Sequence, residues 1–337
     1  MINLSKLQSI SIPRMLPAFL TAPSVTQIHT TELVPMRDGE EITVCTIGAG
    51  DQKVFLVHGV GGSHYAWLPF AVPFFKDFTF IIPNLRGFGL SSEVPYSGDN
   101  VVENYANDLE DLVSYYIDDE EEEKFILCSL SLGALSSLCF LSREDNRSRV
   151  KSYLNVDQAP QAKNSKGWKH GLFGLNQQEL LERTQALIKE TEELGHADLN
   201  GMTKEFRKEY ISTLAYFFAN AFHRPAEKSF INFVMNLDIA PVQLMFSTSN
   251  LNSYLQCINT FNQFENDFKA HLKDFTFPVT VFSGKYSEMY PVRGQTYMVN
   301  SLPNGSHVIF DESHALMYTA PIKFLREFKK FLYEEAT

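Results

Sequence analysis

Six short apolar runs constrain the fold of this chain more than any other feature of its sequence. None alternates strictly between apolar and polar residues, and each ends in glycine or a polar residue. This pattern is typical of strands that are buried on both faces of a parallel sheet. The runs span residues 53–59, 78–84, 124–129, 150–157, 278–284 and 306–311.

Segments with apolar residues at helical spacing lie between these runs, which predicts right-handed βαβ units. We therefore expect an α/β fold with a mostly parallel central sheet flanked by helices. A hairpin is expected ahead of these units, over residues 31–47, because Asp38-Gly39 is a strong turn signal between two strand-like runs.

The spacing of the runs also divides the chain into a core and an insertion. A long stretch between the fourth and fifth runs has apolar residues at helical spacing and no buried strand. We expect residues 161–256 to form a helical cap or lid, inserted after the strand that ends near Asp157. Residues 31–160 and 257–337 would then form the core, and residues 1–30 an N-terminal arm.

Composition excludes several classes of function. The net charge of −11 would repel a phosphate backbone, so we expect no nucleic-acid partner. No apolar run reaches the roughly 18 residues of a membrane span. The 4 cysteines and 9 histidines show no CxxC or HExxH spacing, so neither a metal site nor a cofactor is expected. Free thiols suggest a reducing compartment, and hence a cytoplasmic location.

Glycines and polar residues follow the predicted strands. In open α/β sheets, ligands bind at the carboxyl ends of the strands, so these residues are the candidates for a functional site. They are the turn at 58–62, the segments 84–89 and 129–133, and Asp157, Ser287, Glu288 and His314.

Four of these segments together resemble the α/β-hydrolase superfamily, over about residues 30–335. "VHGVGG" is similar to its oxyanion-hole turn and "PNLRGFGLSS" to its D-x-R-G-x-G-x-S segment. "CSLSLGAL" is similar to its nucleophile elbow, and "SHALMYTAPIKF" to the segment that carries its catalytic histidine. The resemblance implies the α/β-hydrolase fold with a helical lid, in the branch that uses a serine nucleophile.

The resemblance also implies roles for individual residues. Ser131 would be the nucleophile and His314 the general base, since a neutral serine needs a base within hydrogen-bond reach. The backbone amides of Val60 and Leu132 would form the oxyanion hole. One position of the elbow departs from the pattern, because Ser129 stands where glycine is usual. A slightly wider elbow would accept its small side chain.

Two further departures affect the segments around the site. Asn84 replaces the usual Asp of the second motif. The acid normally follows the penultimate strand, but in "GKYSEMYP" the aligned residue is Ser287, which cannot carry a negative charge. The acid is then Asp157, which some members of the superfamily use, or the neighbouring Glu288, or it is absent. We favour Asp157.

The expected function is a serine hydrolase that cleaves an ester, thioester or related acyl bond through an acyl-enzyme on Ser131. The many phenylalanines of the insertion suggest a small-molecule substrate with an apolar acyl or aryl group. The alternative is a ligand- or partner-binding protein on a hydrolase scaffold that has lost catalysis. The sequence identifies neither the substrate nor the oligomeric state.

Overall fold

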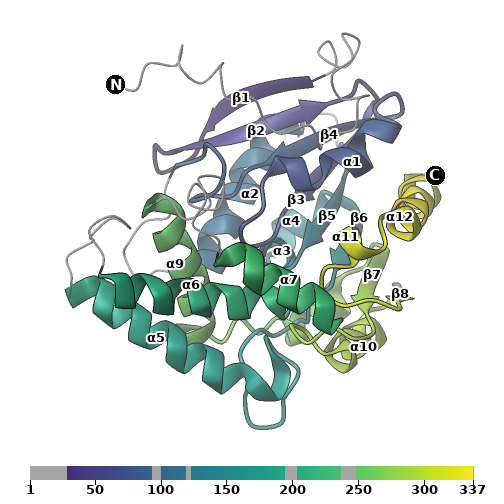
Figure 1. The fold of residues 1–337 in the computed structure, drawn as a ribbon. Coiled ribbons are helices and arrows are strands. Elements are labelled where there is room, and N and C mark those ends of the chain that lie inside the picture. Colours follow the sequence, from purple (N-terminus) through teal and green to yellow (C-terminus); the bar gives the residue numbers. More distant parts are fainter. Residues whose placement is uncertain (1–28, 93–99, 119–122, 194–202, 237–247, 337) are drawn as a thin grey trace.

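The computed structural model describes residues 29–92, 100–118, 123–193, 203–236 and 248–336. Its centre is an eight-stranded sheet with the order β1-β2-β4-β3-β5-β6-β7-β8 (Figure 1). β1 and β2 form the expected antiparallel hairpin, and β2 also pairs antiparallel with β4. The other neighbouring strands are parallel. The fold is therefore the mostly parallel sheet that the sequence predicts.

The six apolar runs all form strands, whose ends lie within two residues of the predicted ones. They match because strands covered on both faces need apolar residues at nearly every position. The strands are β1 (His29–Pro35), β2 (Glu41–Ile47), β3 (Gln52–Val57), β4 (Phe78–Pro83), β5 (Phe125–Leu130), β6 (Val150–Val156), β7 (Val279–Gly284) and β8 (Gly305–Phe310).

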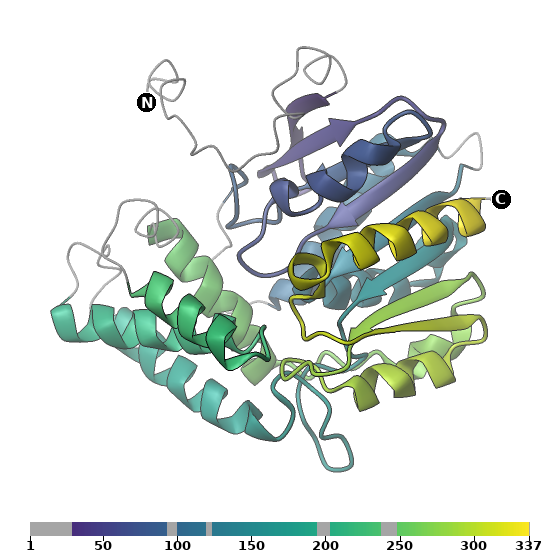
Figure 2. The same cartoon turned by 45° about the vertical axis from the view of Figure 1, so that its right-hand side comes forward.

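Helices cover both faces of the sheet (Figures 1 and 2). The α-helices of the described residues are α1 (Leu68–Ala71), α2 (Val101–Tyr116), α3 (Leu132–Ser142), α4 (Glu144–Ser148), α5 (Gln177–Glu193), α6 (Lys204–Ala219), α7 (Pro225–Met235), α9 (Thr248–Gln263), α10 (Val292–Ser301), α11 (Leu316–Thr319) and α12 (Pro321–Ala336). Short 3₁₀ turns also occur, as η3 (His64–Ala66), η4 (Val72–Phe74), η5 (Gly174–Asn176) and η6 (Lys269–Asp274).

The alternation of side chains along each strand separates two apolar cores. Val54 and Leu56 of β3 pack with residues of α1 and α12, whereas Phe55 and Val57 pack with residues of α2 and α3. Successive side chains of a strand point to opposite faces of a sheet, so both sets are buried. Each core side chain of this size stabilises the fold by about 1.5–3 kcal/mol on burial.

The helices α5, α6, α7 and α9 lie between β6 and β7 in the sequence. They gather at one end of the sheet, where α5 packs on α6 and α9 (Figure 2). The predicted end of the insertion at residue 256 falls inside α9, which continues to Gln263. The reason is that Cys257, Ile258 and Phe261 continue its buried face. The predicted arm at residues 1–30 lies outside the described residues except for its last two.

In the part of the chain that the structure describes, no helix has both the length and the apolar character that crossing a bilayer requires.

Candidate active site

Ser131 lies in the sharp turn between β5 and α3. Its φ of 53° and ψ of −123° are strained for any residue other than glycine. Gly133 permits the close packing of this turn, since a Cβ there would lie 2.4 Å from the carbonyl oxygen of His58. The structure therefore has a strained serine in a sharp strand-to-helix turn, which is the geometry expected of a nucleophile elbow.

The elbow accommodates Ser129 by pairing its hydroxyl with the neighbouring strand. The buried Ser129 hydroxyl donates to the hydroxyl of Tyr153 over 3.0 Å. The Tyr153 hydroxyl in turn donates to the carbonyl of Ala134 in α3 and accepts from the amide of Asn155. Because its polar group is satisfied, a serine at this position does not carry the penalty of an unpaired buried hydroxyl.

His314 follows β8 and faces Ser131. Its Nε2 lies 3.0 Å from Oγ of Ser131, and its Nδ1 lies 2.6 Å from Oδ2 of Asp157. A carboxylate only accepts hydrogen bonds, so Nδ1 carries the hydrogen and Nε2 is left to accept from the serine hydroxyl. This is the tautomer that a general base needs.

Asp157 directly follows β6 and is fully buried. Its carboxylate accepts four hydrogen bonds, which is how a buried charge is held without a large desolvation cost. Oδ1 accepts from the backbone N–H of Gly284 at 2.7 Å and from Nε2 of Gln295 at 2.9 Å. Oδ2 accepts from the hydroxyl of Ser287 at 2.6 Å, besides Nδ1 of His314.

Of the two candidate acids, the structure brings Asp157 and not Glu288 to His314. Glu288 is half exposed and accepts a hydrogen bond from Nζ of Lys228 at 2.6 Å. Ser287 occupies the usual acid position but donates to Asp157. Its oxygen also accepts from the backbone N–H of Tyr290 at 3.2 Å. The aligned position thus contributes a supporting hydroxyl to a carboxylate from another strand.

The two predicted oxyanion-hole residues lie on either side of Ser131. Leu132 follows it directly in the chain, and Val60 lies in the glycine turn after β3. Leu132 is the first residue of α3, so its N–H has no acceptor within the helix. Val60 follows β3 and lines the same cavity as Ser131. Gly59 allows this approach, since a Cβ there would lie 3.0 Å from Cβ of Ser131. The two segments meet at the serine side chain.

The cavity above Ser131 and His314 has a volume of about 220 Å³. Its walls are mostly apolar, and part of them comes from the end of α6 and the turn that follows it. The lining includes Phe217, Phe218, Phe222, Met289 and Tyr318. A site of this composition favours apolar groups next to the serine.

His58 has a structural position. Its Nε2 accepts from the backbone N–H of Leu85 at 2.9 Å, and its Nδ1 donates to the carbonyl of Gly59 at 2.7 Å. Complete burial lowers its pKa to about 4, so the ring is neutral at pH 7. It fixes the glycine turn to the segment after β4.

One group that contacts the acid, the side chain of Gln295, carries no sequence signal. Gln295 lies on α10, where its Nε2 donates to Asp157 and to the carbonyl of Tyr290. Its Oε1 accepts from the hydroxyl of Ser283 at 2.6 Å. A glutamine within a helix belongs to no short motif, and only the packing of α10 against β7 brings it to the carboxylate.

Comparison with known proteins agrees with this geometry. A family profile described as the alpha/beta hydrolase fold matches residues 53–321. The chain belongs to this family. No curated protein sequence gives a significant match.

Solved structures similar to this chain include an esterase from Exiguobacterium antarcticum, with 18% identity and a TM-score of 0.67. The matched region covers 90% of this chain and 100% of the esterase. A bromoperoxidase from Bacillus anthracis has 19% identity and a TM-score of 0.68, with coverage of 90% and 100%. An enol-lactonase from Burkholderia xenovorans has 16% identity and a TM-score of 0.65, again with coverage of 90% and 100%. At these identities the likeness is one of fold.

Proposed function

We propose that this protein is a serine hydrolase that cleaves an ester, thioester or related acyl bond. Ser131 is the nucleophile, His314 the general base and Asp157 the acid. The observation that carries the proposal is the chain of two short contacts, 3.0 Å from Ser131 Oγ to His314 Nε2 and 2.6 Å from His314 Nδ1 to Asp157 Oδ2.

The reaction follows from the directions of these hydrogen bonds. Nε2 of His314 takes the proton of the Ser131 hydroxyl as Oγ attacks the substrate carbonyl, and Asp157 stabilises the imidazolium that forms. The amides of Val60 and Leu132 donate to the oxyanion, each worth about 3–4 kcal/mol. His314 then protonates the leaving group, and water repeats the sequence to release the acid from Ser131.

The substrate is a small molecule with an apolar acyl or aryl group. The cavity of about 220 Å³ presents phenylalanine and methionine side chains next to Ser131. These side chains offer no hydrogen-bond partner for a charged group on the substrate, such as the free carboxylate of a dicarboxylic ester. We assign residues 161–256 as the cap, because Phe217, Phe218 and Phe222 supply part of this wall. A cap excludes water from the reacting groups.

The alternative, a binding protein that has lost catalysis, is the weaker reading. Two of the departures from the family pattern have hydrogen-bond partners, as an intact site needs: Ser129 donates to Tyr153, and Ser287 donates to the carboxylate of Asp157.

Covalent labelling distinguishes the two functions. A fluorophosphonate probe should label the wild-type protein at Ser131, and a panel of p-nitrophenyl esters should show turnover that favours apolar acyl groups. Ser131→Ala should abolish both, while Ser137→Ala, a change in the helix that follows Ser131, should keep both. A wild-type protein that labels no faster than Ser131→Ala refutes the proposal.

A further inference from the structure

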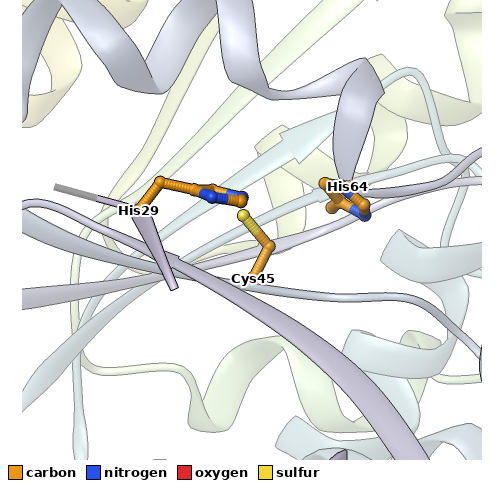
Figure 3. Close-up of side chains that lie close together, drawn as sticks. All are labelled: His29, Cys45 and His64. Atoms are coloured by element: carbon orange, nitrogen blue, oxygen red, sulfur yellow. The ribbon is translucent and has the colours of Figure 1, made fainter. Parts of the chain in front are cut away.

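A group of metal-ligating side chains gathers at the β1–β2 side of the sheet, within the described residues. It consists of His29, Cys45 and His64, whose ligand atoms all lie within 4.8 Å of one another. Figure 3 shows the His29 ring directed at the sulfur of Cys45, with His64 approaching from a separate segment. None of the three takes part in the proposed hydrolysis.

The hairpin register explains how His29 meets Cys45. His29 pairs with Ile47, and Thr31 pairs with Cys45, in the antiparallel ladder of β1 and β2. His29 and Cys45 are therefore diagonal neighbours on the same face of the sheet, within reach of a long side chain. Cys45 is buried and belongs to no disulfide. Its thiol is thus free to act as a ligand.

A hydrogen bond orients His64 as it would orient a metal ligand. Nδ1 of His64 lies 3.1 Å from Oδ1 of Asn84, which can only accept, so Nδ1 carries the hydrogen. Nε2 then keeps its lone pair. The backbone N–H of His64 donates to the same oxygen at 2.7 Å, which fixes the residue further. Histidine ligands of metal ions have such an oxygen partner on the other ring nitrogen.

We propose that His29, Cys45 and His64 bind one Zn²⁺ ion. Imidazole and thiolate are both ligands of zinc. At about 2.0–2.3 Å from a common centre, tetrahedral ligand atoms lie about 3.7 Å apart or less, so the cluster would contract by up to about 1 Å when the ion binds. The Cys45 thiol loses its proton to solvent when the ion binds. Three protein ligands leave the fourth tetrahedral position to a water molecule.

Such an ion would connect two parts of the fold that the chain itself does not join closely. His29 and Cys45 belong to the hairpin, whereas His64 belongs to η3. Ala66 of η3 and Gly62, two residues before η3, line the cavity that contains Ser131. The ion would therefore stabilise the segment that follows the glycine turn, from outside the cavity.

The experiment measures Zn²⁺ binding to the full chain after removal of metals with a chelator. Calorimetric titration with ZnCl₂ should give about one ion per chain, and Co²⁺ should give the charge-transfer absorption of a cobalt–thiolate bond. Zn²⁺ should also raise the melting temperature by several degrees, since an ion that binds only the folded state stabilises it. These readouts do not depend on catalytic activity.

Variants of the ligands separate this site from adventitious binding. Cys45→Ala and His29→Gln should each weaken Zn²⁺ binding by about 100-fold or more, since loss even of a residue that only orients a ligand costs about 10–100-fold, and each should remove the thermal shift. His29→Gln changes a side chain that is only partly buried, so it carries the test if Cys45→Ala does not fold. The matched controls are Cys139→Ala and His271→Gln, which should bind Zn²⁺ as the wild type does. The proposal is overturned if the wild type binds no Zn²⁺, or if His29→Gln binds it unchanged.

Discussion

Replacing Asp157 with asparagine should lower kcat by about 10⁴, which corresponds to about 5 kcal/mol of transition-state stabilisation. The carboxylate accepts from four donors, two on each oxygen. Asparagine offers only one acceptor oxygen, so its NH₂ group must face two of these donors in either orientation.

The partners decide which orientation results. The N–H of Gly284 cannot reverse, and Gln295 is held by Ser283 through its Oε1. The NH₂ group therefore turns toward Ser287 and His314. The Ser287 hydroxyl can rotate and accept, but His314 must then move its hydrogen to Nε2. In that tautomer it cannot take the proton of Ser131.

The assay is the hydrolysis of a p-nitrophenyl ester at a fixed pH near neutral, with folding checked by circular dichroism. The substitution should lower the free energy of unfolding by about 1–3 kcal/mol, as expected for hydrogen bonds lost from a charged group. Glu288→Gln is the matched control, because it breaks only a surface ion pair worth at most about 1 kcal/mol. If folded Asp157→Asn keeps kcat within tenfold of the wild type while Glu288→Gln collapses, the assignment of the acid is wrong.

Three further predictions concern the surroundings of the site. Burial lowers the pKa of His58 from 6.5 to about 4, so between these pH values His58 binds a proton in the unfolded state but not in the folded state. The free energy of unfolding should therefore fall by up to about 3 kcal/mol as the pH drops from 6.5 to 4. Urea titrations at pH 7 and pH 4.5 should show this loss in the wild type and a smaller one in His58→Gln. Gly133→Ala should destabilise the fold by about 1–3 kcal/mol and reduce kcat, since the added Cβ would lie 2.4 Å from the carbonyl oxygen of His58. An unchanged melting temperature and unchanged kcat would contradict the close packing of this turn. Phe218→Ala should enlarge the cavity and shift the preferred acyl chain to a longer one in an ester panel, and an unchanged chain-length profile would exclude Phe218 from the acyl site.

The sheet and the elbow could be predicted from the sequence because their determinants are local. A strand such as β5 is buried on both faces, so its apolar run stands out from the helices around it. The strain at Ser131 is marked by Gly133, two residues away. The helical character of the segment between β6 and β7 was also predicted, but the end of its last helix was not, since the buried face of α9 continues past residue 256.

The sequence favoured Asp157 as the acid but left Glu288, or no acid at all, as alternatives. Asp157 and Glu288 both follow strands, and the direction of each side chain depends on the backbone at that point. Asp157 has a φ of 48°, an unusual conformation for a residue other than glycine. The supporting Gln295 and the convergence of His29, Cys45 and His64 arise from segments far apart in the chain. Motif spacing, from which we expected no metal site, does not detect side chains brought together in this way.

The three departures from the family pattern have a common physical explanation. Each introduces a polar side chain at a buried position, where an unpaired group would cost about 1–3 kcal/mol. Ser129 donates to Tyr153, Ser287 donates to Asp157, and Asn84 accepts from His64. Each partner belongs to a different segment, so the replacements are matched by residues elsewhere in the chain. A scaffold that had merely lost its catalytic residues gives no reason for such pairs. The hydrogen bond from Ser287 to Asp157 in particular supports the proposal that the acid comes from the end of β6.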